Sequence, residues 1–155
     1  MKTVIKMSEH KALAQKLFYD GYNCAQAVLL AFEDVTGLDK KTAAMLASSF
    51  GGGLGRMREV CGAVSGASMV LGLTKGYCDP KDFEAKKAHY ARVQEFARRF
   101  KEQNGSIICR ELLSGVETEK GGMPEKRTER YYHKRPCALL CKCAADILDE
   151  MFTES

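Results

Sequence analysis

The apolar residues of this chain recur at helical spacing almost from end to end. No short segment alternates apolar and polar side chains convincingly, as a half-buried β-strand would. This pattern predicts an all-α fold. A length of 155 residues suits one domain, so we expect a single helical domain over 1–155, a bundle of about six or seven helices.

Capping residues and glycines mark the expected helix ends. The expected starts are Ser8, Asn23, Asp39, Cys61 after its glycine-rich turn, Asp79 with Pro80, Ile107 and Pro136, and the expected ends are Gly21, Gly37, the glycines at 51–53, Gly76, Gly105 and Leu113. The second helix is expected over 24–35. The polar stretch 114–134 has no apolar period and is predicted to be a mobile loop.

Charge and segment length exclude several classes of protein. The net charge of +4 is modest and its basic excess lies mainly in 120–135, which does not favour nucleic acid as a partner. The first residues lack the apolar core of a signal peptide, and the apolar stretch 60–73 is shorter than the roughly 20 residues that span a bilayer. We therefore expect a cytoplasmic protein, in which the seven cysteines are reduced.

Four of these cysteines share one structural position. Cys24, Cys61, Cys109 and Cys137 each fall in the first turn of an expected helix. A helix N-terminus stabilises an anion and can lower a thiol pKa well below the ~8.5 of free cysteine, and the thiolate is the form that binds metal or attacks a disulfide. For each cysteine alone a role as a small buried apolar residue is the commoner one. If the four helix starts converge, they form one sulfur cluster.

The helix expected at 61–73 contains glycines that need an explanation. Gly62 and Gly66 each cost up to ~1 kcal/mol against alanine. Close approach of another helix explains them better than a pocket, but Gly62, Ser65 and Gly66 are also candidate cofactor-binding residues beside Cys61. Cys61, Ser65 and Met69 would share one helix face.

The other motifs carry less information. Cys78 and Cys143 are expected to have no role in the site, whereas Cys141, one turn after Cys137, can act as a further ligand or a resolving thiol. There is no C-x-x-C pair, and "GGGLGR" matches no phosphate-loop pattern. His133 would reach a site only if the 114–134 loop folds back.

The sequence resembles a known family of small redox-active proteins named for the pattern C_GCAxxG_C_C. The resemblance lies in "LFYDGYNCAQAVLLAF", "FGGGLGRMREVCGAVSGASMVLGL" and "NGSIICRELL", and in Cys137 before "AADIL". It implies that Cys24, Cys61, Cys109 and Cys137 are the redox-active or metal-binding residues. Genes of this family often lie near transporter genes, which implies a functional link to a membrane transporter. A similar domain of a multihaem cytochrome is associated with an iron centre, but this chain lacks C-x-x-C-H, so covalent haem is not expected.

Three functions follow from these residues. The first is electron transfer through a metal centre, an iron–sulfur cluster above all, with a redox partner that the sequence does not identify. The second is metal-free thiol and disulfide exchange. The third is a non-redox helical module whose cysteines bind structural zinc.

Overall fold

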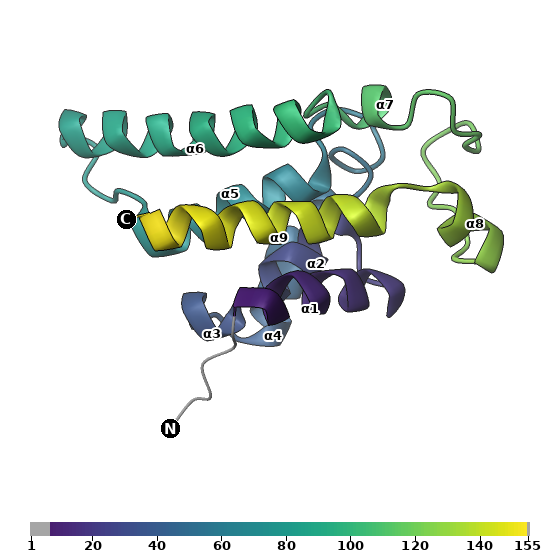
Figure 1. Ribbon diagram of the computed structural model, residues 1–155, viewed down its shortest axis with the longest axis horizontal. Helices are drawn as coiled ribbons and strands as arrows, with labels where there is room; N and C mark the ends of the chain where they lie inside the picture. Colours follow the sequence, from purple (N-terminus) through teal and green to yellow (C-terminus); the bar gives the residue numbers. More distant parts are fainter. Residues whose placement is uncertain (1–6, 155) are drawn as a thin grey trace.

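The chain folds into helices joined by short turns and one long irregular segment (Figure 1). The structure is a computed structural model that describes residues 7–154, and this part contains nine α-helices, one 3-10 helix and no β-strand. The elements are α1 Met7–Tyr19, α2 Cys24–Ala31, α3 Glu33–Thr36, α4 Lys40–Ala47, η1 Ser48–Phe50, α5 Gly62–Lys75, α6 Phe83–Asn104, α7 Cys109–Leu112, α8 Glu129–Lys134 and α9 Cys137–Glu154. The prediction of an all-α fold is confirmed.

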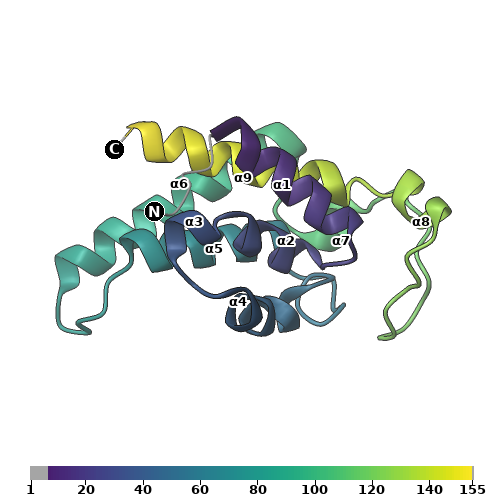
Figure 2. The same cartoon turned by 90° about the horizontal axis from the view of Figure 1, so that it is seen from below.

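The long C-terminal helix α9 lies between α1 and α6 and forms the centre of the bundle (Figure 1). Helices α2 and α5 pack against each other and against α9, and α4 covers α2 on the far side (Figure 2). The core between these helices is apolar, and its largest fully buried side chains include Phe18, Phe32, Phe96 and Phe100. None of the helices in 7–154 is long and apolar enough to cross a membrane.

Several helices begin or end at the residues that the sequence predicts, and local capping explains these boundaries. The Asn23 side chain accepts a hydrogen bond from the Gln26 N–H, and the Gln26 side chain accepts one from the Asn23 N–H, a reciprocal capping box. Asp39 caps α4 by accepting from the Thr42 N–H. Gly37 and Gly105 end their helices at φ values of 69° and 93°, a left-handed conformation that favours glycine.

Other boundaries differ from those expected. The helix expected over 24–35 breaks at Phe32, whose ring stacks on His10 with a centroid distance of 4.2 Å. Asp79 and Pro80 form a turn, and Asp82 caps α6 instead by accepting from the Ala85 N–H. Ser8 lies inside α1 rather than before it. The break at Phe32, together with α8 inside 114–134, accounts for more helices than expected.

Close packing of α5 on α2 explains the glycines of α5. A Cβ atom at Gly66 would lie 2.5 Å from the carbonyl oxygen of Ala25, and one at Gly62 would lie 3.0 Å from the Cβ of Cys24. The two helix backbones are therefore in direct contact at these positions. This contact places Cys24 beside the start of α5, where Cys61 stands.

Candidate four-cysteine site

Four helix starts meet around one small cavity. Cys24, Cys109 and Cys137 are the first residues of α2, α7 and α9, and Cys61 is the N-cap residue of α5. All four line a cavity of about 50 Å³, larger than the 10–15 Å³ that one water needs. The four cysteines thus stand at helix starts, as expected from the sequence. The fold brings these four starts together around the cavity.

A short backbone bridge joins two of the cysteines across the chain. Val60 and Ile108 form an isolated antiparallel bridge. The N–H of Cys61 donates to the Ile107 carbonyl oxygen at 2.8 Å, and the N–H of Cys109 donates to that of Glu59 at 2.6 Å. This bridge fixes Cys61 and Cys109 side by side although 48 positions separate them in the sequence.

The four cysteines are buried, with exposed fractions of 9% for Cys24, 3% for Cys61, 9% for Cys109 and 8% for Cys137. The thiols of Cys24 and Cys137 lie close enough to shift each other's pKa in opposite directions. Cys141 lies behind them, and its thiol approaches the Cys24 carbonyl oxygen at 3.9 Å. The site therefore consists of four thiols around the cavity and a fifth in contact with one of them.

The prediction that the helix starts lower the thiol pKa values is wrong for the protein without a bound cation. The pKa values of all four thiols are raised instead. Burial raises the pKa of Cys61 to about 12, although the N–H groups of Ala63 and Val64 act in the expected, lowering direction. The contact with Cys137 favours the Cys24 thiolate, but contact with Cys141 and burial outweigh it and raise the pKa of Cys24 well above its ordinary value.

The pKa values of the remaining two thiols, Cys109 and Cys137, are also raised. The hydrogen bond with Cys24, and then burial, raise the pKa of Cys137. Burial also raises the pKa of Cys109. The helix-terminus effect is thus present but smaller than the cost of burying several thiolates together.

Arginines form the positive part of the site, and the sequence interpretation missed them. The Arg58 guanidinium donates to the Cys109 sulfur at 3.7 Å and lowers the pKa of that thiol in part. The charge of Arg135, which is 8% exposed, acts to lower the pKa of Cys137. Arg127 also lines the cavity. The sequence signal for Arg127 and Arg135 was the basic stretch 120–135, which has the composition of an ordinary solvated loop, whereas Arg58 lies in the glycine-rich turn before Cys61.

A single metal ion needs several ligands around one point. Among the residues that the structure describes, no three His, Cys, Asp or Glu side chains are grouped so as to hold one ion. The donor set itself is four cysteine sulfurs on one cavity, the set that iron–sulfur clusters use. The cavity thus presents four thiols, but the described residues contain no preformed site for a single metal ion.

The other candidate residues lie in several places. Gly62 lines the cysteine cavity, whereas Gly66 packs against the backbone of Ala25. Ser65 and Met69 line a separate apolar hollow of about 470 Å³ that contains no cysteine, so the row expected from Cys61 through Met69 does not face one cavity. The role of Gly62, Ser65 and Gly66 in binding a cofactor stays a prediction.

The outlying cysteines lie apart from the cavity. Cys78 is exposed in the turn before α6. Cys143 lies on the side of α9 that faces α6, where its sulfur accepts a hydrogen bond from the Asn104 amide at 3.4 Å. Neither residue lines the cysteine cavity.

Arginine contacts attach the segment 114–134 to the cysteine site. Arg56 donates to the Glu125 carboxylate at 2.9 Å and to the carbonyl oxygens of Glu119 and Gly121. Arg127 donates to the carbonyl oxygens of Phe18 and Tyr22. The segment expected to be a loop therefore contains α8 and is bonded to the helices around the cavity.

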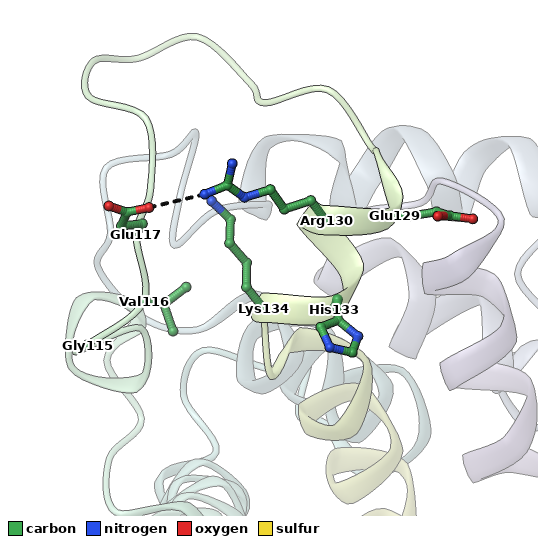
Figure 3. Close-up of a pocket in the computed structure, with 7 residues that line it drawn as sticks. All are labelled: Gly115, Val116, Glu117, Glu129, Arg130, His133 and Lys134. Carbon is green, nitrogen blue, oxygen red and sulfur yellow. Dashed lines mark hydrogen bonds and ion pairs between the residues drawn. The ribbon is translucent and has the colours of Figure 1, made fainter.

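The outer side of this segment forms a hollow of about 730 Å³ away from the cysteines. Figure 3 shows Arg130 and Lys134 extending toward Glu117, and Arg130 bonds to Glu117 at 3.5 Å. His133 also borders this hollow rather than the cysteine cavity. The ion pair is strongly exposed, so it contributes little to stability.

The comparisons with known proteins agree with the cysteine site. Residues 22–151 match the family described as "Putative redox-active protein (C_GCAxxG_C_C)". The chain belongs to this family. No curated protein and no solved structure gave a significant match. The matched range contains all four cysteines of the cavity and the whole of α2 through α8.

Proposed function

We propose that this family member transfers electrons through an iron–sulfur cluster bound by Cys24, Cys61, Cys109 and Cys137. The observation that carries the proposal is that four thiols from four separate helix starts surround one cavity. When bound, such a cluster would accept and release single electrons. In the reducing cytoplasm that the sequence predicts, the thiols would be free to bind it.

The burial of the four cysteines supports electron transfer rather than exchange with a protein disulfide. An attacking thiolate must reach the sulfur of its substrate, and these thiols are between 3% and 9% exposed. An electron can instead pass to a buried centre without contact between sulfur atoms.

The charges around the cavity support a cationic occupant. Several buried thiolates without positive charge beside them would be very costly. Arg58 contacts Cys109, and Arg135 acts on Cys137, but Cys24 and Cys61 have no arginine in comparable contact. In the proposed complex, metal ions would offset the charge of these two residues, and N–H donors at Cys61 would help to set the potential.

Structural zinc would place a stricter demand on the four thiols than a two-iron cluster would. A zinc ion needs its four ligands around one point, at about 2.3 Å for sulfur. No group of three such side chains converges in this way within residues 7–154. A two-iron cluster would take two cysteines at each iron, and four cysteines line this cavity.

A second candidate function is supported by the contact between Cys24 and Cys137. Oxidation of these two thiols to a disulfide would release two electrons and two protons. A small peroxide that enters the cavity would take them up, with cleavage of its O–O bond and release of water. Cys141, in contact with Cys24, would be the alternative partner in that disulfide.

Anaerobic purification followed by visible and EPR spectroscopy distinguishes the two candidates. The proposed function predicts a coloured protein with iron and acid-labile sulfide in equal amounts. The dithiol alternative predicts a colourless protein that loses two thiols per chain on titration with peroxide. Colourless protein that is inert to peroxide would contradict both.

Matched cysteine variants test the assignment of the residues. Cys61→Ser should abolish the cluster because Cys61 lines the cavity, whereas Cys78→Ser should keep it because Cys78 is exposed elsewhere. Equal loss in the two variants would contradict the site.

A further inference from the structure

A second cavity, of about 360 Å³, adjoins the cysteine cavity on the side of the 114–134 segment. Arg58, Arg127 and Arg135 line both cavities, and Arg56 lines the second one. A volume of this size lies at the lower end of the range for small-molecule sites, about 300–1,000 Å³. The cavity therefore suits a small ligand rather than a macromolecule.

The charge of this cavity is unbalanced. Against four guanidinium groups, the cavity lining within the described residues contains one carboxylate, that of Glu125. Glu125 already binds Arg56 at 2.9 Å and Arg135 at 2.6 Å. Burial acts to raise the pKa of Glu125, but the Glu119 N–H, Arg135 and Arg56 together outweigh it and lower that pKa. The carboxylate is thus fully used by two arginines, and positive charge remains around the cavity.

One arginine has a donor that nothing in the described protein uses. The side chain of Arg135 is only 3% exposed, and its buried Nε–H has no hydrogen-bond partner among the described residues. The guanidinium lies over the Tyr131 ring, 4.5 Å from its centroid, which fixes the plane of the group. A buried charged donor without a partner is costly, and Arg135 also lines the cavity, so negative charge bound there would offset part of that cost.

The backbone N–H groups of Leu54 to Glu59, in the glycine-rich turn, are bonded within the turn. They donate to carbonyl oxygens of residues 49–54. Leu54, Arg56 and Arg58 have positive φ values, which turn this backbone sharply just before Cys61. The turn therefore positions the side chains of Arg56 and Arg58 at the cavity, and recognition falls to guanidinium groups.

We propose that this arginine-lined cavity binds a small oxyanion, with Arg58 and Arg135 as its main ligands. Guanidinium groups match the geometry of sulfate, phosphate and carboxylate oxygens and bind them with charge-assisted hydrogen bonds. Arg56 and Arg127 are positioning residues, because their own donors are bonded to the 114–134 segment and to the end of α1. The inference rests on the proposed function only in that the anion would lie beside the redox centre.

Isothermal titration of the full chain with sodium sulfate in low-chloride buffer tests the proposal. We expect saturable binding of one sulfate per chain. Phosphate and malonate, tested in competition, distinguish a tetrahedral inorganic anion from a carboxylate as the preferred ligand, and displacement by either supports the site. Absence of saturable sulfate, phosphate or malonate binding would overturn the proposal.

Arginine variants locate the binding. Arg58→Gln and Arg135→Gln should each weaken sulfate binding at least tenfold, whereas Arg130→Gln should leave it unchanged because Arg130 is in the same basic stretch but is 80% exposed outside this cavity. Arg58 is half-buried, so its variant serves if the Arg135 variant fails to fold. Equal affinity in the wild type and in Arg58→Gln would refute the assignment.

A cysteine variant separates this site from the proposed redox centre. Cys61→Ser should lose the cluster and retain sulfate binding, because Cys61 does not line the second cavity. Sulfate binding by a protein without iron would leave the anion site standing while the proposed function fails. A protein that contains iron but binds none of the three anions would leave the proposed function standing while the anion site fails.

Discussion

Replacement of Gly66 by alanine tests whether direct backbone contact between α5 and α2 explains the glycines of α5. The new Cβ would lie 2.5 Å from the Ala25 carbonyl oxygen and 3.1 Å from the Ala25 Cα. Both neighbours are backbone atoms, so relief requires movement of a whole helix. The matched control is Gly72→Ala in the same helix, where a Cβ would meet nothing within 4 Å.

The expected magnitudes have opposite signs. Alanine gains up to ~1 kcal/mol of helix propensity at either position. Overpacking costs about 1–3 kcal/mol, and the upper part of that range applies where backbone must move. Gly66→Ala should therefore lower the free energy of unfolding by about 1–2 kcal/mol, and Gly72→Ala should raise it by about 0.5–1 kcal/mol.

Thermal unfolding followed by circular dichroism measures the difference. For a chain of this length, about 2–4 °C accompanies each kcal/mol, so Tm should fall by about 2–8 °C in Gly66→Ala and rise slightly in Gly72→Ala. A Gly66→Ala variant as stable as Gly72→Ala would refute the close-packing explanation.

Three further predictions concern single residues. Glu125→Gln should leave buried arginine charge unpaired, cost about 3–5 kcal/mol locally and speed tryptic cleavage within 114–134, whereas Glu117→Gln, at an exposed pair, should not. Burial alone would lower the pKa of His10, but its bonds to Asp149 and Asp34 raise it above 6.5. The stabilisation from His10 is therefore complete below pH 6.5 and lost as the pH rises through the folded-state pKa, so urea unfolding of His10→Gln should differ most from wild type in acid and least in base. Asn23→Ala removes the cap of α2 and should cost about 1 kcal/mol in urea unfolding; no loss of stability would contradict the capping box.

The sequence predicted the parts of this fold that depend on local chemistry. Caps such as Asn23 and Asp39 accept hydrogen bonds from N–H groups three residues away, so they can be recognised without knowledge of the rest of the chain. Asp79 and Pro80 gave an equally strong local signal and failed. Asp79 accepts a hydrogen bond from the Lys81 N–H in a turn, and Asp82, three residues later, takes the capping position.

The candidate site shows the same division. The four cysteines were recognisable because each stands at a helix start and belongs to the family pattern. The arginines could not be recognised in this way, because Arg58 and Arg135 are far apart in the sequence and meet only in the folded chain. Contacts between distant segments, such as the ion pair between Arg56 and Glu125, bring them to one cavity. The pKa prediction was wrong for a related reason. Mutual contact and burial of the thiols are properties of the assembled fold, and they exceed the effect of any one helix terminus.

The proposed redox centre is most directly tested by X-ray absorption at the iron edge of anaerobically prepared protein. If the cavity holds a cluster on Cys24, Cys61, Cys109 and Cys137, every iron should have sulfur neighbours only, with a second iron close by. A Cys143→Ser control should give the same spectrum, because Cys143 lies outside the cavity. Nitrogen or oxygen ligands at iron, or protein that binds no iron at all, would contradict the proposed centre.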